Sequence, residues 1–238
     1  MIRSPIVTHA EPAQLSTAAT AGWGLLILAL TAAVHGLTAA AMTPADATPV
    51  GLRDDGLIFS VGILASALAG AAATLAVLRR RSPRTYLALV WPRVASLALW
   101  IAIAALTAAA LDGVTHLLGR PLIPEAWFAT FHGARSLPLL LLALVVVAPV
   151  YEEMYFRGFL HRGLASSRLG PAGAVAVVAL LFSLAHFPED GWSFAQGLTT
   201  GALLGAARQH TGSLVPCIVV HALLNAKVML QLALGGPG

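Results

Sequence analysis

Seven apolar windows divide the sequence, and each is long enough, or nearly so, to cross the hydrocarbon core of a bilayer as a helix. A helix needs about 20 apolar residues to cross about 30 Å, because each residue adds about 1.5 Å. Backbone groups in lipid must be hydrogen-bonded internally, so the windows predict a bundle of helices. We place them at about 21–41, 56–78, 94–118, 137–163, 171–187, 193–209 and 212–234.

The composition excludes a soluble globular protein. Hydrophobic residues make up 58% of the 238 residues and charged residues only 10%, which leaves too little polar surface to cover a globule in water. We therefore predict an all-α, polytopic transmembrane bundle of about seven spans. We divide the chain into a polar N-terminal segment (1–20), three N-terminal transmembrane helices (21–135) and a C-terminal core of four transmembrane helices (136–238).

Basic residues predict how the bundle is oriented. The loop at 79–84 carries the strongest arginine cluster, and such loops favour the cytoplasmic side. Alternation of the spans then puts the N-terminus in the cytoplasm and the C-terminus outside. The net charge of +4 is spread over short loops, which argues against nucleic-acid binding. We interpret the window at 21–41 as a retained anchor, because its apolar stretch is longer than that of a signal peptide.

Three segments place ionisable or strongly polar side chains inside apolar stretches. They are Tyr-Glu-Glu-Met-Tyr-Phe-Arg at 151–157, Phe-Ser-Leu-Ala-His at 182–186 and His-Ala-Leu-Leu-Asn at 221–225. Such groups are tolerated in lipid where they face a bundle interior or a wet cavity, so they indicate a functional site. Each residue taken alone also fits a structural role. Their occurrence on three different helices favours one shared site, equipped for acid–base hydrolysis.

The two neighbouring glutamates are predicted to differ in their surroundings. Glu153 and Arg157 are four residues apart with the acid nearer the N-terminus, which is the favourable direction for an ion pair on a helix. Glu152 points about 100° away from Glu153 around the helix. We therefore expect Arg157 to hold Glu153 charged, and Glu152 to be the freer carboxylate and the candidate general base.

The other two segments repeat the four-residue spacing. Phe182 shares a helix face with His186, as His221 does with Asn225, so each pair can face one cavity. Counting about 1.5 Å per residue from the predicted cytoplasmic ends places Glu152 and His221 at a depth of about 15 Å. The same count places His186 at about 22 Å, so His186 fits the shared site least well.

Other polar and small residues predict structural roles. Asp112 and His116 are spaced to pair near the outer end of the third span, and Lys227 is interpreted as a single group that snorkels or hydrogen-bonds locally. Glycines repeat every fourth residue at 197, 201 and 205, as they do where membrane helices pack closely. Cys217 is expected in the core.

These motifs carry a resemblance to a known family. Glu-Glu-x-x-x-Arg, Phe-x-x-x-His and His-x-x-x-Asn, in this order on successive helices, resemble the CPBP (ABI) family of CAAX proteases and bacteriocin-processing enzymes. The similarity covers about 150–226 and includes Gly-Ala-Leu-Leu-Gly at 201–205 and Gly-Ser-Leu at 212–214. It implies an intramembrane endopeptidase that hydrolyses a peptide bond of a membrane-associated protein or peptide.

The resemblance also implies roles for individual side chains. The catalytic residues are Glu152, His186, His221 and Asn225, supported by Glu153, Arg157 and Phe182. The first glutamate and the second-motif histidine would activate a water, while the third-motif histidine and asparagine would stabilise the oxyanion. Two imidazoles and a carboxylate also suit a zinc ion. Because His-Glu-x-x-His is absent, we favour a glutamate mechanism without a metal cofactor, and zinc is the alternative.

The expected partners are the lipid bilayer and a membrane-associated substrate, with no nucleic acid. The expected location is a bacterial cytoplasmic membrane. A proton-coupled transporter or channel is the rival function, because Glu, His and Arg relays at membrane depth also move ions. Internal repeats would favour a transporter, and none are seen in the sequence. A scaffold that binds membrane proteins without cleaving them is the third possibility, which the intact motifs argue against.

Overall fold

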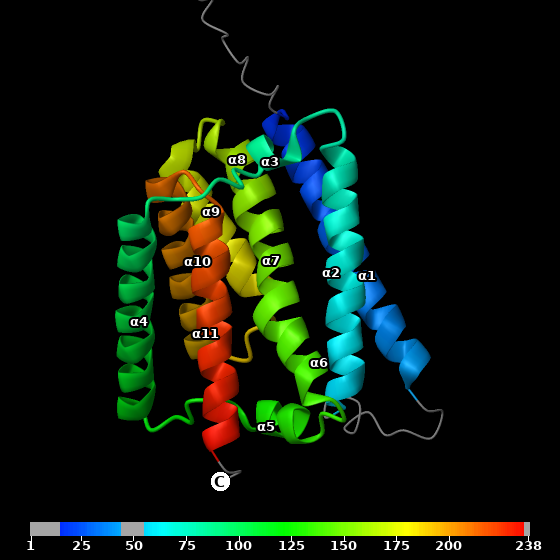
Figure 1. The fold of residues 1–238 in the computed structure, drawn as a ribbon, viewed down its shortest axis with the longest axis vertical. Helices are drawn as coiled ribbons and strands as arrows, with labels where there is room; N and C mark the ends of the chain where they lie inside the picture. Colours follow the sequence, from blue (N-terminus) through cyan, green and yellow to red (C-terminus); the bar gives the residue numbers. More distant parts are fainter. Residues whose placement is uncertain (1–14, 44–54, 236–238) are drawn as a thin grey trace, which may run out of the picture.

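The computed structural model describes residues 15–43 and 55–235, and every regular element within them is helical (Figure 1). The α-helices are α1 (Thr17–Met42), α2 (Gly56–Val77), α3 (Pro83–Tyr86), α4 (Val94–Leu117), α5 (Glu125–His132), α6 (Leu137–Leu141), α7 (Ala148–Glu153), α8 (His161–Ala165), α9 (Gly170–Ala185), α10 (Gly191–Thr211) and α11 (Val215–Leu234). Two π-helical stretches, η1 (Leu142–Val147) and η2 (Met154–Leu160), join α6, α7 and α8 into one continuous helix. The predicted all-α class is confirmed.

The predicted windows correspond to the long helices of the bundle. Their ends agree within four residues with α1, α2, α4, the continuous α6–α8 helix, α9, α10 and α11. Five helices of the described chain are long and apolar enough to cross a membrane. The other two are α9, which has only 16 residues, and α10, and they pack together as a helical hairpin. Sequence reasoning missed the short helices α3 and α5, which lie in connections.

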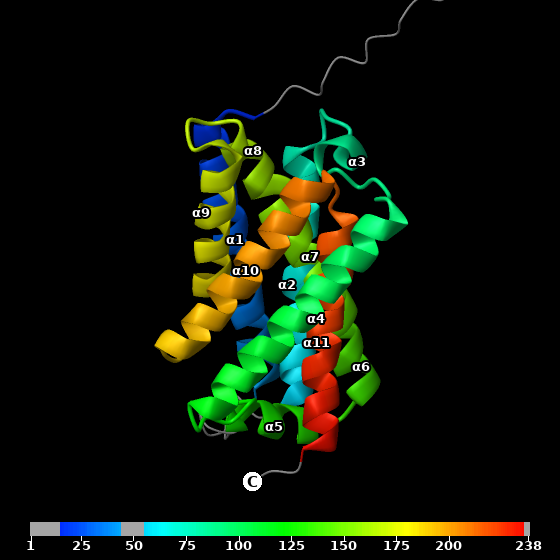
Figure 2. The same cartoon turned by 90° about the vertical axis from the view of Figure 1, so that its left-hand side faces the viewer.

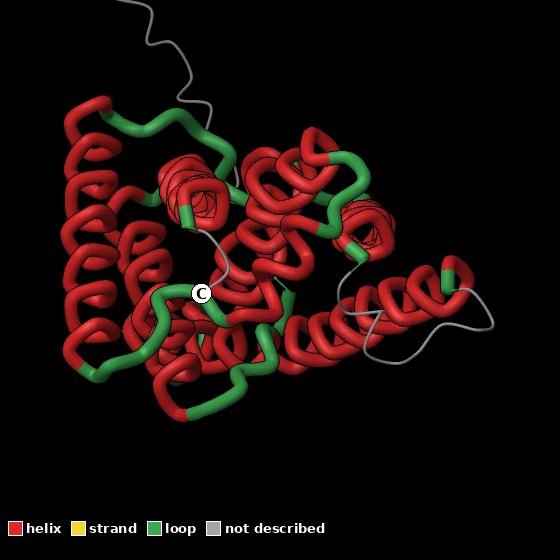
Figure 3. The backbone as a smooth tube through the Cα atoms, turned by 90° about the horizontal axis from the view of Figure 1, so that it is seen from below, coloured by secondary structure: helices red, strands yellow, loops and turns green. Residues whose placement is uncertain are grey.

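The connections gather at two opposite ends of the bundle. The start of α1, the 78–93 connection and the α8–α9 turn lie at one end, whereas α5 and the end of α11 lie at the other (Figure 1). The α4 and α10 helices are strongly tilted (Figure 2). Seen from below, α1 and α4 slant across opposite sides of the bundle (Figure 3). The predicted alternation of the spans is therefore present in the fold.

More arginines lie at one end of the bundle than at the other. We call the end near α3 the arginine-rich end, because it carries Arg79, Arg80, Arg81, Arg84, Arg93, Arg162, Arg168 and Arg208. At the opposite end, Arg120 pairs with Asp190 and Arg135 with Asp55. The hydrogen bond from Arg120 lowers the pKa of Asp190. Asp190 is therefore charged near neutral pH, and it caps α10 by accepting from the Ser193 amide.

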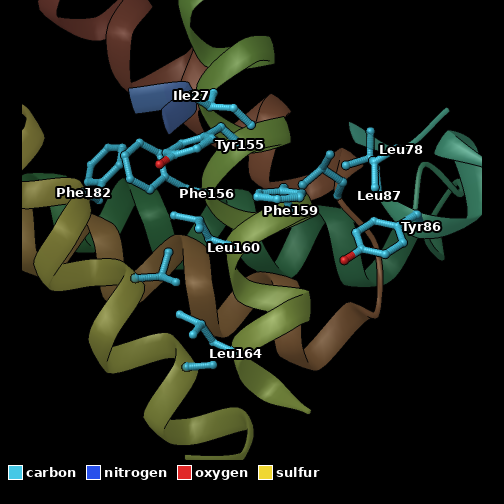
Figure 4. Close-up of a cluster of buried hydrophobic side chains, with 13 residues drawn as sticks. Ile27, Leu78, Tyr86, Leu87, Tyr155, Phe156, Phe159, Leu160, Leu164 and Phe182 are labelled. Carbon is cyan, nitrogen blue, oxygen red and sulfur yellow. The ribbon is translucent and has the colours of Figure 1, made fainter. Parts of the chain in front are cut away.

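The main hydrophobic cluster lies around η2 at the arginine-rich half of the bundle. Its aromatic rings come largely from η2, with Tyr155, Phe156 and Phe159 all buried (Figure 4). Ile27 of α1 and Phe182 of α9 pack against the same cluster. Tyr155 also donates from its hydroxyl to the carbonyl oxygen of Gly24 at 2.8 Å, which satisfies the polar end of a buried ring. These contacts join α1 and α9 to the central helix.

The predicted small-residue stripe packs α10 against α9. Positions 197, 201 and 205 lie against Ser183, Ala179 and Val175 in turn, as two antiparallel helices require. A Cβ atom at Gly201 would lie 2.9 Å from the Cα atom of Ala179, so the helices approach closely only because that side chain is missing. The close approach holds α9 and α10 beside the central helix.

The central helix loses one backbone hydrogen bond at a proline. The amide of Ala148 bonds to the carbonyl of Ala143, five residues earlier, as in a π-helix. Pro149 follows and has no N–H, so the carbonyl oxygen of Leu144 has neither its α-helical nor its π-helical donor. The sequence thus leaves a free acceptor in the middle of the bundle, and a side chain from another helix has to satisfy it.

Candidate active site

Glu153 on α7 is the centre of a buried polar network. Its side chain is fully buried, and its Oε1 atom accepts two hydrogen bonds, each at 2.8 Å. One comes from Nη1 of Arg157, so the predicted ion pair is present. The other comes from Nδ1 of His221 on α11. The carboxylate therefore joins the central helix to the last helix of the bundle.

Arg157 is held from three sides inside η2. Besides Glu153, its Nη2 atom donates to the carbonyl oxygen of Gly201 at 3.0 Å. Its guanidinium lies 4.4 Å from the centre of the Phe182 ring, within the range of a cation–π contact. A buried arginine with no exposed surface needs such partners, because an unpaired charge in a low-dielectric interior is costly. Arg157 therefore ties α9 and α10 to the glutamate pair.

Glu152 faces the opposite way and meets both motif histidines. Its Oε2 atom lies 3.7 Å from Nε2 of His186 and 3.8 Å from Nε2 of His221. These distances are too long for direct hydrogen bonds. This oxygen is buried and has no hydrogen-bond partner among the described residues. Oε2 of Glu153 also lacks a hydrogen-bond partner among the described residues, so the two glutamates differ at their other contacts: Glu153 accepts two hydrogen bonds at Oε1, whereas Glu152 faces two imidazoles.

Hydrogen bonds at the other ring nitrogens orient the two imidazoles. Nδ1 of His186 lies 2.7 Å from the carbonyl oxygen of Phe182, and a carbonyl only accepts, so this nitrogen carries a proton. Nδ1 of His221 donates in the same way to the Glu153 carboxylate. In their neutral forms both rings therefore present an Nε2 lone pair toward Glu152. His221 becomes a donor at Nε2 only when it takes up a second proton.

Asn225 satisfies the free carbonyl of the central helix. Its Nδ2 atom donates to the Leu144 oxygen at 2.8 Å, which is the acceptor that Pro149 leaves without a backbone donor. An amide nitrogen has two protons, so one N–H remains after this bond. The sequence predicted that Asn225 shares a helix face with His221, and both residues contact the central helix. The bond to Leu144 was not foreseen, because it depends on how the two helices dock.

Phe182 packs between the guanidinium of Arg157 and the imidazoles of His186 and His221. Its ring centre lies 4.4 Å from that of His186 and 5.6 Å from that of His221. The ring therefore separates Arg157 from the histidines and fixes the orientation of both imidazoles. Phe182 belongs to the hydrophobic cluster around η2, so the packing of the core also positions the polar site.

The depth count for His186 was the weakest part of the sequence analysis. The structure brings this residue to Glu152, so the apparent mismatch of several ångströms does not exist. Along α9 the count stands, because the helix begins at Gly170 and His186 forms its C-cap. The mismatch came from treating every helix as untilted and as starting at one level. Phe187, with a positive φ of 48°, follows at the turn that ends the helix. The packing of α9 against the central helix decides the depth of His186.

A pocket of about 450 Å³ opens beside these side chains. It is lined by Glu152, His186, His221 and Asn225, and it extends along α11 to a second polar group formed by Asp112, Lys227 and Gln231. The remaining wall comes from apolar side chains of α2, α4, α11 and the 122–127 segment and from α10, which adds polar side chains such as Gln196. A substrate segment in this pocket would therefore meet all four predicted catalytic residues.

Asp112 does not form the pair with His116 that the spacing allows. Instead of contacting His116, its two carboxylate oxygens lie 2.7 and 2.6 Å from the ammonium of Lys227. Gln231 also donates to Asp112, at 3.3 Å. The i,i+4 spacing permitted the local pair, but α11 passes beside α4 and supplies a permanent cation. Lys227 is 115 residues away in sequence, so no local pattern indicates this contact.

Metal binding requires several ligand side chains at one point. In residues 15–43 and 55–235, no group of three or more His, Cys, Asp or Glu side chains is arranged to hold a metal ion. Cys217 is buried in α11 as predicted, and it is separate from this site.

Comparison with known proteins gives one match. Residues 134–227 match the family model described as type II CAAX prenyl endopeptidase, Rce1-like. This part of the chain is similar to the CAAX protease family, and residues 134–227 are called the CAAX protease segment for that similarity. The matched segment contains the central helix, the α9–α10 hairpin and most of α11, so it includes all three polar motifs. No curated protein and no solved structure matches the chain.

The CAAX protease segment carries every side chain of the network described above. The first three long helices lie outside it, and two of them, α2 and α4, contribute walls to the pocket, including the carboxyl group of Asp112. The family is one of membrane-embedded endopeptidases, and the bundle of apolar helices fits an integral membrane protein.

Proposed function

We propose that this CAAX protease segment is an intramembrane endopeptidase in which Glu152 activates the hydrolytic water. One observation carries the proposal: the free Oε2 atom of Glu152 faces the Nε2 atoms of two histidines at 3.7 and 3.8 Å, in the pocket. A gap of this length between a carboxylate oxygen and an imidazole nitrogen lets one water molecule contact both atoms. Glu152 and His186 would hold that water as two acceptors and direct its oxygen toward a bound peptide.

The chemistry needs no other proton carrier than Glu152. The carboxylate takes one proton from the water as its oxygen attacks the carbonyl carbon of the scissile bond. When the carbon–nitrogen bond breaks, Glu152 returns this proton to the departing amine. The products are a carboxylic acid and an amine, and Glu152 is regenerated as a carboxylate. The low-dielectric walls of the pocket strengthen each of these electrostatic steps.

Stabilisation of the oxyanion falls to Asn225 and His221. Asn225 has one N–H left after its bond to Leu144, and this donor belongs to a side chain whose position is already fixed. His221 contributes a donor at Nε2 when its ring carries a second proton, and its Nδ1 bond to the Glu153 carboxylate holds the ring in place. Glu153 and Arg157 act through His221 as positioning residues. The role of His221 therefore depends on protonation, whereas that of Asn225 does not.

The substrate that we propose is a membrane-associated protein or peptide. The pocket lies among apolar helices and is mostly apolar itself, so a segment delivered from the bilayer fits it better than a soluble polar peptide. The family description names CAAX prenyl substrates. A farnesylated peptide that ends in a CAAX sequence and the same peptide without the lipid are therefore the two defined probes.

The decisive experiment compares wild-type protein with the Glu152→Gln variant in lipid nanodiscs. Cleavage of either probe is followed by mass spectrometry, which also identifies the new chain ends. Gln keeps the size of the side chain but removes the base, so cleavage should fall to background while the protein stays folded. Glu189→Gln, in the exposed α9–α10 turn, is the matched control and should retain full activity. Cleavage at the wild-type rate by Glu152→Gln overturns the proposal.

The same assay separates the metal-free mechanism from a zinc mechanism. If zinc is required, Glu152, His186 and His221 are the side chains that would hold it, and a zinc ion would then polarise the carbonyl and the water. We propose that activity survives 1,10-phenanthroline, with the metal content of the purified protein measured in parallel. A loss of activity that added zinc restores would assign the zinc mechanism instead.

The rival transporter function makes a different prediction. A channel or proton-coupled transporter would move protons across liposomes with a pH-sensitive dye inside, and it would not produce new peptide ends. We expect no proton flux above that of empty liposomes. Flux that is lost in Glu152→Gln, without any cleavage, would favour the transporter.

A further inference from the structure

A second groove, of about 560 Å³, lies on the outside of the bundle between α1 and α2. The two helices run side by side at the edge of the fold, as Figure 1 shows. From α1 the groove is lined by Trp23, Leu26 and Leu30, and from α2 by Ala73 and Ala76. The small alanine side chains leave the space that the larger α1 residues border. None of the four proposed catalytic residues lines this groove, so it is separate from the substrate pocket.

The groove has one charged end, formed by the residues that follow α2. Arg79, Arg80 and Arg81 all line it at the arginine-rich end of the bundle. Arg79 and Arg80 are exposed, and no carboxylate of the described residues pairs with either of them. The site therefore combines an apolar trough along two helices with cationic groups at its mouth.

The position of Trp23 marks the level of this mouth in the membrane. Trp23 lies six residues into α1, which places it about 9 Å below the start of the helix. Tryptophan is enriched at the boundary between headgroups and hydrocarbon. The groove below Trp23 therefore faces acyl chains, whereas the arginines above it face phosphates.

We infer that this groove is a binding site for an anionic phospholipid. One acyl chain lies in the trough against Leu26, Leu30 and Ala73, and the phosphate lies near Arg79 and Arg80. The charge complementarity argues for an anionic rather than a zwitterionic lipid, since basic pockets between membrane helices bind anionic headgroups. Guanidinium groups also match the oxygens of a phosphate in geometry. This inference does not depend on the proposed proteolysis.

The test is a lipid titration of the full chain in neutral detergent, followed by native mass spectrometry to obtain Kd. Phosphatidylglycerol and phosphatidylcholine with identical acyl chains are the two probes. Phosphatidylglycerol should bind more tightly, and its advantage should shrink at high ionic strength because charge attraction is screened. Equal affinity for the two lipids overturns the inference.

Two kinds of variant locate the site. Arg79→Gln with Arg80→Gln should weaken phosphatidylglycerol binding roughly tenfold or more. Arg84→Gln with Arg168→Gln removes the same charge from exposed positions outside the groove, and it should change Kd less than twofold. If both double variants lose the same affinity, the overall positive charge of the arginine-rich end explains the lipid binding, and the site is refuted.

The third variant fills the trough without changing any charge. Ala73→Trp should reduce the binding of phosphatidylglycerol, while thermal unfolding without added lipid reports whether the bundle is intact. Ala72→Trp, an exposed neighbour that does not line the groove, is the matched control. Wild-type affinity in a folded Ala73→Trp variant refutes the trough. If that variant does not fold, the two arginine variants still decide the inference.

Discussion

Asn225 donates a hydrogen bond to the carbonyl oxygen of Leu144, 81 residues earlier in the chain. The acceptor is free because Pro149 interrupts the backbone hydrogen bonds of the central helix. Asn225 therefore has two tasks: it completes the hydrogen bonding of a buried backbone, and it offers its second N–H to the proposed oxyanion.

The Asn225→Ala variant should show both tasks at once. Loss of the oxyanion donor should lower turnover about 10²–10³-fold. Loss of the Leu144 bond should lower the free energy of unfolding by about 1–3 kcal/mol, because a buried carbonyl stays unsatisfied. Steady-state kinetics and thermal unfolding in detergent measure the two effects. Leu230→Ala, at an exposed position of the same helix outside the pocket, is the control and should change both quantities little. Wild-type turnover in Asn225→Ala contradicts the oxyanion role.

The Arg157→Ala variant should harm stability more than any other change at the site. It leaves the fully buried Glu153 without its cationic partner, which costs about 3–5 kcal/mol unless the acid takes up a proton. Thermal unfolding in detergent measures the loss, with the exposed Arg168→Ala as control.

A second substitution tests the cause of that loss. Glu153→Gln in the Arg157→Ala background removes the unpaired charge and should recover part of the lost stability. The amide oxygen still accepts from Nδ1 of His221, so the histidine keeps its orientation. If the single Arg157→Ala variant is as stable as wild type, the ion pair is not what supports the site.

Asp112 and Lys227 should behave as a coupled pair that ties α4 to α11. Lys227→Met leaves an unpaired carboxylate and should lower the free energy of unfolding by about 1 kcal/mol, since both side chains are about a third exposed and partly screened. Adding Asp112→Asn should recover part of this loss. A double-mutant cycle measures the coupling, and strictly additive effects would show that the pair is unimportant. The change of His116 to Ala serves as control, because His116 does not contact Asp112.

The orientation in the membrane remains a prediction from arginine placement. We expect the 79–84 loop in the cytoplasm and the end of α11 outside. Single cysteines at Ser82 and Gly235, labelled with a membrane-impermeant maleimide on intact cells, test this. Gly235→Cys should react at once and Ser82→Cys only after lysis. The native Cys217 is fully buried and should give no background in the folded protein. Labelling of Ser82→Cys on intact cells would reverse the orientation.

The sequence by itself determined the helices and the residues of the site. Apolar windows predicted the seven long helices to within a few residues, because a bilayer fixes how many apolar residues a span needs. The i,i+4 spacing predicted the Glu153–Arg157 ion pair, since both partners lie on one helix. The repeated glycines predicted the close packing of α10, and they pack against α9.

Only the tertiary structure decided which atoms meet across helices. The bond of His221 to Glu153 joins residues 68 positions apart, and it fixes which nitrogen of the ring faces Glu152. The Leu144 carbonyl and the Lys227 ammonium find their partners in the same way, through the docking of α11. The depth of His186 depends on the level and tilt at which α9 packs against the central helix, which a count of residues along one helix does not contain. Local spacing fixes neighbours on one helix, whereas the rotation, tilt and depth of each helix follow from packing against all the others.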